Sequence, residues 1–485
     1  MTHKPGAQGK LVQILTVGSA TMLVVSSIIG SGVYKKVAPM ADALQSPLLV
    51  LLCRLLAGII SLFGALSNAE VAGMLAGSGG EYVYYKRIYG RFMAFIYGWS
   101  VFAVIKTAAI ASIAYVFSQS FHSLCPLPDL PESIENIRLL GLFKPFENAG
   151  VKGLTILTIL VLTFLNSRGL RGGSFLSSTL SKVIIVGLGL IVVSGLLFGG
   201  GSLKNITTNS ASYIPRHWWD FNLVKAMFMA MLAAFWAYEG WNHIGFIGGE
   251  IKNPNRNLPV SIFSGMAIVI TAYLLVNFTY LYVLPVDQLI DVYKTQNDIA
   301  AIIVVRSYAA SAGTLILSVL ILLTTLGATN SNVIMPARIF YAMGKDNLFF
   351  AGSSYVHPKY NTPSTALWIQ SCWSSFLVLT GSFDQLTDML IFAAFLFYGF
   401  TTFGVFILRV REPRMPRPYK VWGYPFVPGL FILFCLCLII ITCITRPREA
   451  GLGLALMLSG IPFYLYWTSR HNRKNPGTAG ATTGG

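Results

Sequence analysis

The chain has 485 residues, of which 54% are hydrophobic and only 11% are charged, whereas about 25% of the residues in a soluble domain are charged. Water is therefore excluded as its main solvent. The formal net charge of +17 would suit a nucleic-acid-binding protein, but the basic residues lie between apolar stretches of roughly 20 residues, which indicates membrane topology and no nucleic-acid partner.

Hydrophobic stretches long enough to span a lipid bilayer recur along the whole chain. The first ten residues, MTHKPGAQGK, are polar and basic and do not resemble a cleavable signal sequence, so the first apolar stretch is expected to remain as a membrane helix. The sequence predicts about twelve spanning helices. They lie near residues 12–39, 47–74, 92–121, 153–166, 174–200, 222–249, 258–284, 308–342, 364–381, 387–409, 425–445 and 450–469.

The distribution of basic residues predicts how these helices are oriented. An even number of spans places both termini on one side of the membrane. With the termini inside, roughly twenty Lys and Arg residues fall in inner segments and about twelve in outer ones, as the positive-inside rule requires. We therefore predict a multi-pass protein of the plasma (cytoplasmic) membrane with both termini in the cytoplasm.

Glycine interrupts two of the predicted helices near their middle. The first helix reads VVSSIIGSGVY and the sixth reads FWAYEGWNHIGFIGG. Glycine weakens a helix, and peptide groups freed within lipid must meet protein, water or a ligand. Corresponding breaks in two halves of a chain are typical of transporters built from inverted repeats. The alternative is that Gly30 and Gly32 only permit close helix packing.

The chemistry of these breaks suits a zwitterion. The N–H groups of Ser31 and Gly32, at the positive end of a half-helix, would bind a carboxylate. Carbonyl groups that end the preceding half-helices would bind an ammonium group. These carbonyls belong to Ile28, Trp236, Ala237 and Glu239. The predicted substrate is therefore a free amino acid, and the candidate substrate-binding residues are Ile28, Gly30, Ser31, Gly32, Trp236, Ala237, Tyr238, Glu239 and Asn242.

Five stretches of the sequence carry a family resemblance. They are IIGSGVY, GALSNAEVAGMLAGSGGEYVYYKRIYG, FWAYEGWNHIGFIGGEIKNPNRNLPVSI, ATNSNVIMPARIFYAMGKDNLF and LSGIPFYLYW. Over nearly the whole chain they resemble the amino acid-polyamine-organocation superfamily and, within it, the L-type amino acid transporter group. The resemblance implies an all-α integral membrane fold with a five-plus-five inverted-repeat core, discontinuous helices 1 and 6, and alternating access to an amino acid site.

The repeat organisation implied by this resemblance divides the chain into five parts. They are a cytoplasmic tail at 1–11, a first repeat at 12–200, a second repeat at 222–410, two peripheral helices at 425–469 and a disordered cytoplasmic tail at 470–485.

The resemblance also implies roles for two residues. Trp236 matches the aromatic residue that closes over substrate as a gate; a plain core aromatic is the alternative. Lys182 matches a lysine that takes the place of sodium in relatives without sodium coupling, where it reaches helix 1 near Gly30 and a polar cluster in helix 8. That cluster consists of Thr329, Asn330 and Ser331. An interfacial lysine that extends to the cytoplasm is the alternative for Lys182.

Four further polar residues within the spans are open to more than one interpretation. Glu239 could pair with cationic substrates, carry a coupling proton, or stay neutral against neighbouring helices. Asn242 could bind substrate or hold the broken helix in place. Arg54 and Lys106 could line the transport route, pair with an acid or extend to the interface.

Nothing in the sequence supports an enzyme, a metal site or a cofactor. The six cysteines have no CxxC or Cys/His spacing, and the histidines have no ligand spacing. Cys125 lies where eukaryotic members of the family carry the cysteine that bonds a glycoprotein. A lone outer cysteine more often has no such bond, so a heavy-chain-type partner is not expected.

The predicted function is sodium-independent transport of L-amino acids, by exchange or facilitated passage, with Lys182 in place of a sodium ion. Proton-coupled symport is the nearest alternative. A non-transporting amino acid receptor on the same fold belongs to another class and would need a signalling segment, which the short tails do not supply. The sequence does not determine the preferred side chain, the coupling, the oligomeric state or the organism.

Overall fold

The computed structural model describes residues 16–75, 80–139, 143–169, 173–242, 251–296, 298–360 and 362–474, without the side chains of 173–182, 254–255, 295–296 and 471–474. Within these ranges all regular structure is helical, apart from one isolated β-bridge between Leu139 and Phe143. The prediction of an all-α fold is confirmed.

The helices follow the predicted order. The first half of the chain contains α1 (Val17–Ile28), α2 (Gly32–Lys35), α3 (Val37–Leu44), α4 (Pro47–Met74), α5 (Glu81–Ile88), α6 (Arg91–Ser100), the π-helix η1 (Val101–Ile105), α7 (Lys106–His122), α8 (Glu132–Glu135), α9 (Ala149–Ser167), α10 (Gly173–Phe198) and α11 (Leu203–Thr207). The second half contains α12 (Phe221–Tyr238), α13 (Pro254–Val283), α14 (Val286–Asp291), η4 (Val292–Gln296), α15 (Ala300–Ile334), α16 (Ala337–Lys345), α17 (Ser364–Thr380), α18 (Phe383–Arg411), α19 (Phe426–Thr445), α20 (Pro447–Leu458) and α21 (Gly460–Lys474).

Nine helical segments in the described part of the chain are long and apolar enough to cross a membrane. They coincide with nine of the predicted helices. The other three predicted helices correspond to the broken segment α1–α3, to α10, whose apolar part is described from Val183 to Phe198, and to α17, which has 17 residues. The count of about twelve spans therefore stays a prediction.

The break predicted in helix 1 is present. α1 ends at Ile28, because Ile29 is extended (φ −70°, ψ 109°), and α2 begins at Gly32. The first half of predicted helix 6, α12, ends at Tyr238 and is followed by Gly240 with φ 114°, an angle that glycine adopts without steric cost. The rest of predicted helix 6, residues 243–250, lies outside the described residues.

The eighth predicted helix, at 308–342, differs from the structure at both ends. α15 already begins at Ala300, and non-helical angles at Ala310 (φ 47°, ψ −143°) separate its first turns from the long helix. Alanine is a strong helix former, so the sequence carries no signal for this kink. At the other end α15 stops at Ile334, two residues before Pro336, and the chain continues as α16.

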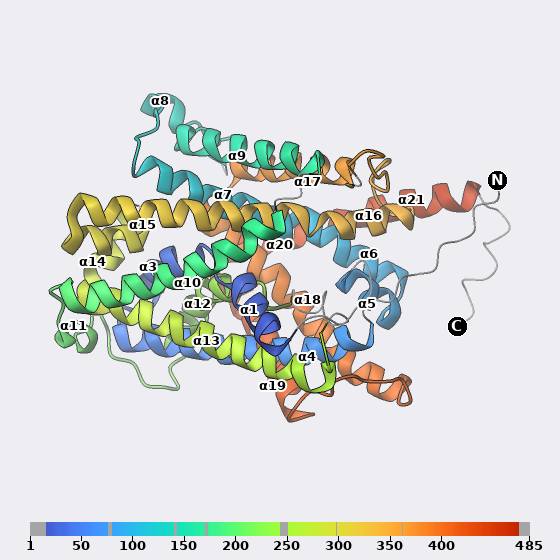
Figure 1. Ribbon diagram of the computed structural model, residues 1–485, viewed down its shortest axis with the longest axis horizontal. Helices are drawn as coiled ribbons and strands as arrows, with labels where there is room; N and C mark the ends of the chain where they lie inside the picture. The colour runs from blue at the N-terminus through green and yellow to red at the C-terminus, as the bar shows by residue number, and fades with distance from the viewer. Residues whose placement is uncertain are drawn as a thin grey trace.

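Five of the short helices lie toward two ends of the molecule (Figure 1). α8, α11 and α14 lie at one end of the long axis, and α5 and α16 lie at the other. The first group includes the acidic sequences ESIE and VDQLID, whereas α5 and α16 carry most of their charge as Lys and Arg. The two ends therefore differ in charge, as the predicted topology requires.

Small side chains allow the central helices to approach closely. Buried residues of α7 include four alanines and three serines, and α7 packs along α15. α12 packs on α3 and α4, and α1 packs on α13. Alanine and serine permit backbones to come near each other where lipid gives no hydrophobic driving force between helices. This packing encloses the residues around the helix 1 break.

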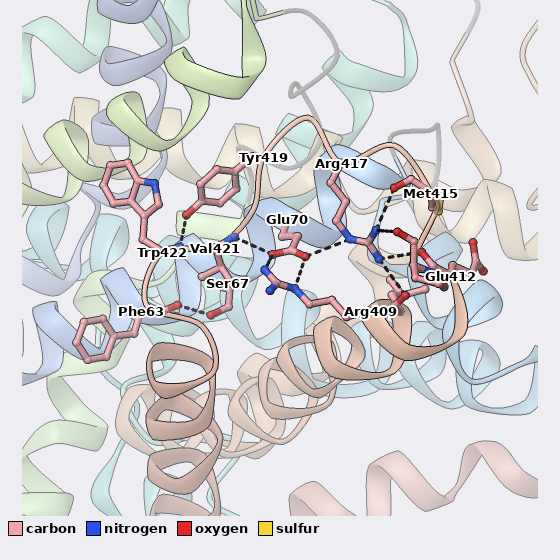
Figure 2. A network of polar contacts seen from close by, with 12 residues as sticks. Phe63, Ser67, Glu70, Arg409, Glu412, Met415, Arg417, Tyr419, Val421 and Trp422 are labelled. Atoms are coloured by element: carbon pink, nitrogen blue, oxygen red, sulfur yellow. Dashed lines mark hydrogen bonds and ion pairs between the residues drawn. The ribbon is translucent and has the colours of Figure 1, made fainter.

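A buried carboxylate ties the end of α4 to the end of α18 (Figure 2). Glu70 accepts two hydrogen bonds from Arg409, at 2.9 and 2.7 Å, and one from the backbone N–H of Val421 at 2.7 Å. Arg417 lies 3.5 Å from the same carboxylate and donates to the Leu408 carbonyl at 2.9 Å. The network holds the loop after α18 against α4 and satisfies a carbonyl at the helix end.

Candidate functional site

A cavity of about 180 Å³ lies at the break of helix 1. Its walls come from α1, α2, α7, α15 and the end of α12, and Ile184 of α10 completes the lining. The lining includes these residues of the sequence-derived candidate site: Ile28, Gly30, Ser31, Gly32, Trp236, Glu239 and Ser331.

The breaks of helices 1 and 6 are in direct backbone contact. A Cβ atom on Gly32 would lie 2.5 Å from the Cα of Ala237, and one on Gly240 would collide with the carbonyl oxygen of Ser27. Glycine is the residue without a Cβ, so both positions require it. These two glycines bring the two interrupted backbones together at the cavity.

Tyr273 of α13 bridges the two breaks from behind. Its hydroxyl lies 3.3 Å from the carbonyl oxygen of Ile28 and 2.9 Å from that of Ala237. Both carbonyls were predicted to receive a substrate ammonium group. In this structure the tyrosine hydroxyl contacts both of them, so it fixes their positions and shares their hydrogen-bonding capacity.

The start of α2 offers hydrogen-bond donors at the cavity. The first N–H groups of a helix have no intrahelical acceptor, and Ser31 and Gly32 occupy this position and line the cavity. The Ser31 hydroxyl is also buried, without a hydrogen-bond partner among the described residues. Donors at the positive end of a helix favour an anionic group.

An ion pair lines the cavity next to these donors. The ammonium group of Lys106 lies 3.2 Å from the carboxylate of Glu239, and both side chains are 11% exposed. The hydroxyl of Tyr398 donates to the same carboxylate at 2.8–2.9 Å. Lys106 follows directly on the π-helix η1, and such insertions re-aim the side chains of a helix at functional sites. Several roles were open for Lys106 and Glu239 from the sequence. In the structure, the two residues pair with each other.

The cavity is closed on the side of α2 and α3. The Trp236 ring meets the Phe383 ring edge to face at 6.1 Å between centroids. Lys36 lies 4.7 Å above the same Phe383 ring and pairs with Asp384 at 2.6 Å. Its ammonium group also donates to Thr387 at 2.7 Å. An aromatic layer and a charged layer therefore separate the cavity from this end of the molecule.

The opposite side of the cavity is open along α1. Leu23 of α1 and Met335, just after α15, line the cavity and are 41% and 45% exposed. Ser26 and Ser27, also in the lining, are partly exposed. The cavity therefore opens beside the N-terminal half of helix 1.

Three candidate residues at the end of α12 lie outside the cavity lining. The peptide of Ala237 packs against Gly32. The hydroxyl of Tyr238 donates to the carbonyl of Arg54 at 3.1 Å, and the amide of Asn242 donates to the carboxylate of Glu81 at 3.3 Å. Burial raises the pKa of Glu81, opposed by hydrogen bonds from Tyr97 and Asn242. For Asn242, the contact in the structure holds the broken helix in place.

The structure describes the helix 8 residues of the candidate cation site but not the side chain of the lysine expected to face them. Ser331 lines the cavity. Thr329 donates to the backbone carbonyl of Thr325 at 2.7 Å, and the side-chain oxygen of Asn330 accepts from the side-chain amide of Asn166 at 2.6 Å. The side chain of Lys182 lies outside the described part of the molecule. The role of this lysine stays a prediction.

Four residues of the site carried no sequence-derived assignment. They are Tyr273, Asn332, Phe383 and Tyr398. Asn332 lines the cavity and directly follows the predicted polar cluster of helix 8. The polar run ATNSN could therefore have identified Asn332 as a candidate site residue from the sequence. The aromatic residues are indistinguishable in sequence from the many that fill helix interfaces.

Sequence comparison with known proteins identifies the family of this chain. The sequence model of the family described as "Amino acid permease" matches residues 15–465. The serine/threonine exchanger SteT of Bacillus subtilis is 29% identical over 447 residues, which cover 92% of this chain and 94% of the relative.

Mammalian transporters show a similar level of identity. The human b(0,+)-type amino acid transporter 1 is 29% identical over 456 residues, covering 92% of this chain and 86% of that protein. The human cystine/glutamate transporter is 26% identical over 468 residues, covering 95% and 87%. These relatives are transporters and exchangers, and none is an enzyme by its description.

Proposed function

The chain belongs to the amino acid permease family, and from that premise we propose that this multi-pass membrane protein is a sodium-independent secondary transporter of L-amino acids. It works by alternating access, as an exchanger or a facilitated transporter. The substrate carboxylate binds the N–H groups of Ser31 and Gly32, and its ammonium group binds carbonyls at the helix 1 and helix 6 breaks.

The observation that carries this proposal is the broken helix 1 at the wall of a cavity. Peptide groups in mid-membrane require partners, and those at the start of α2 face a space large enough for a small solute. The neighbouring Lys106–Glu239 pair places one positive and one negative charge in the cavity wall, so the pair leaves the net charge of the wall unchanged. A zwitterion complements donors on one side and carbonyls on the other.

The descriptions of the relatives favour exchange over facilitated transport. One relative is a serine/threonine exchanger, and the match covers 94% of that exchanger's length. We further propose that Lys182 occupies the place of a sodium ion beside helix 1. Support comes from α10, the helix that carries Lys182, because it contributes a residue to the cavity lining beside the helix 1 break.

We propose the plasma membrane as its location, with the termini and the open side of the cavity facing the cytoplasm. The acidic and basic ends of the molecule support this orientation. Trp236, between the cavity and Phe383, is then the outer gate over the substrate. Cys125 is an exposed free thiol, and the proposal requires no glycoprotein partner.

Uptake by purified protein in proteoliposomes tests the proposal. Vesicles loaded with unlabelled amino acids should take up a radiolabelled one, and excess substrate of the same class should compete. Replacing Na⁺ with choline should leave the rate unchanged. Uptake equal to that of protein-free vesicles would reject transport, and a strict Na⁺ requirement would reject the role of Lys182.

Proton coupling is resolved by a further arm of the same experiment. Glu239 lines the cavity and is the acid that a proton-coupled mechanism would use. Under the exchange proposal, an imposed pH gradient without internal substrate does not concentrate amino acid. Concentration that disappears in Glu239→Gln would replace exchange with proton-coupled symport.

A further inference from the structure

Arg54 is a buried cation with no acidic partner among the described residues. It lies in α4 and is 0% exposed. One of its terminal nitrogens, Nη2, donates to the Asn277 side-chain oxygen at 3.2 Å. Nε and Nη1 have no hydrogen-bond partner within the same part of the chain. Three of the five N–H donors of the guanidinium are on these two atoms.

The surroundings of Arg54 contain tyrosines in place of acids. Its ionisable neighbours are Tyr238, Tyr273 and Tyr280, and the guanidinium carbon lies 5.9 Å from the centre of the Tyr273 ring. No Asp or Glu in the described part of the chain lies within ion-pair distance of it. The hydroxyl of Tyr280 is itself buried, with no partner in the ranges that the structure describes.

Two other buried cations of this protein are compensated within the described part of the chain. Lys36 pairs with Asp384 at 2.6 Å, and Lys152 donates to the backbone carbonyls of Lys144 and Pro145 at 2.6 and 3.5 Å. A charge removed from water requires a compensating charge or several hydrogen bonds, and within a membrane this requirement is stricter. A single neutral amide and one aromatic ring face do not meet it. Arg54 therefore calls for an anion that the described part of the chain does not supply.

The helices pack closely beside Arg54. One turn further along α4, a Cβ on Gly58 would lie 2.5 Å from Ile270 of α13 and 2.9 Å from the hydroxyl of Tyr238. α4, α12 and α13 are therefore closely packed one turn from Arg54. This packing favours a small monovalent ion such as chloride over a larger anion, and one negative charge balances the single charge of Arg54.

We propose that a small monovalent anion, chloride under cellular conditions, binds between α4 and α13, held by Arg54 and the hydroxyl of Tyr280. The site is separate from the substrate cavity, whose described lining does not include either residue. It adjoins Tyr273, whose hydroxyl contacts both helix breaks. Anion binding therefore stabilises the fold and the arrangement of the breaks together.

Thermal unfolding of the purified full-length protein tests the proposal without reference to transport. The unfolding midpoint is measured at constant ionic strength and constant Na⁺ while gluconate is replaced stepwise by chloride, bromide or nitrate. The midpoint should rise saturably with each small anion. At ten times its dissociation constant, the anion should shift the folding equilibrium about 11-fold.

Variants locate the effect. Arg54→Met and Arg54→Gln should abolish the anion response, whereas Lys86→Met, an exposed cation elsewhere, should retain it in full. Tyr280→Phe should weaken the apparent anion affinity by about tenfold, because it removes a hydrogen bond to a charged group. If both Arg54 variants fail to fold, the wild-type protein and Tyr280→Phe decide the question.

Two results would overturn the proposal. One is a wild-type midpoint that is the same in gluconate and in the small anions. The other is an anion response that persists unchanged in foldable Arg54 variants or in Tyr280→Phe, because the binding would then lie elsewhere.

Discussion

The Lys106–Glu239 pair sets the charge of the cavity at the level of single residues. Each side chain compensates the other, and Tyr398 fixes the carboxylate from a third helix. A substrate with a charged side chain would compete with one member of the pair. We therefore expect the transporter to prefer amino acids with uncharged side chains, and we expect the pair to control this preference.

Replacing Lys106 tests that expectation. Lys106→Met leaves the carboxylate of Glu239 facing the cavity without its ammonium partner. Stability should fall by about 1–3 kcal/mol, because a mostly buried charged group loses a partner. Uptake should shift from alanine toward lysine and arginine, which can supply the missing cation. Thermal unfolding and competitive uptake in proteoliposomes measure the two effects.

Two comparisons make this result specific. Lys86→Met breaks an exposed pair with Asp346 and should cost less than about 1 kcal/mol. The double variant Lys106→Met/Glu239→Gln should regain stability relative to Lys106→Met, since the two changes are coupled. An unchanged substrate preference in Lys106→Met would contradict a role of the pair in selectivity.

At the scale of elements, the two broken helices depend on glycine where they touch. Gly32→Ala would press a methyl group against the backbone of α12, and Gly240→Ala would do the same against α1. Over-packing of this kind costs about 1–3 kcal/mol. Each variant should lower the initial uptake rate by at least about tenfold, measured in proteoliposomes at matched protein content.

Other glycines of helix 1 provide the controls. A methyl group added at Gly18 would meet no described atom within 4 Å, so Gly18→Ala should transport normally. Gly30 lines the cavity, yet the nearest neighbour of such a methyl group would lie 4.0 Å away. Gly30→Ala should therefore fold normally, and a raised KM in this variant would report on space for the substrate. Wild-type rates in Gly32→Ala would refute the contact between the breaks.

The junction of α4 and α18 depends on one carboxylate. Glu70 is 1% exposed and faces two arginines (Figure 2). Glu70→Gln removes its charge and leaves Arg409 and Arg417 without a counter-ion, which should cost about 3–5 kcal/mol. The loss should appear as a lower thermal unfolding midpoint in detergent.

An exposed pair next to this network is the matched comparison. Arg87 and Glu412 lie 2.8 Å apart, but the arginine is 58% exposed. Arg87→Gln should change stability by less than about 1 kcal/mol. Equal effects of Glu70→Gln and Arg87→Gln would show that burial does not govern the strength of the junction.

For the whole molecule, the exposed part of the described cavity lining lies beside α1, and the side of α2 and α3 is closed. Ser26 lines the open side, whereas Thr387 lies in the charged layer that closes the other. In a protein whose exposed cysteines Cys125, Cys372 and Cys443 are replaced by serine, Ser26→Cys should react with a membrane-impermeant thiol reagent. The reaction should occur in inside-out vesicles and slow down several-fold with saturating substrate.

The closed side supplies the control for labelling. Thr387→Cys, 0% exposed in this state, should react slowly from either side until the transporter opens outward. Labelling of Ser26→Cys from the outer face alone would reverse the proposed orientation. Labelling that substrate does not slow would separate this cavity from the transport site.

Much of the fold was predictable because the bilayer imposes local rules. A span needs about 20 apolar residues, so nine predicted helices reappear as candidate spans within the described residues. The break at Gly30 was predictable because glycine weakens a helix and a matching glycine interruption occurs in the second half of the chain. The kink at Ala310 was not, because alanine carries no signal against a helix.

The sequence by itself determined which segments enter the membrane, where helix 1 breaks and which peptide groups line that break, since each depends on residues that are neighbours in the chain. Only the tertiary structure decided which side chains meet at the cavity. Lys106 and Glu239 are 133 positions apart, and Glu239 and Tyr398 are 159 apart. Such contacts depend on how each helix is rotated against its neighbours, and that rotation is fixed by packing over the whole molecule.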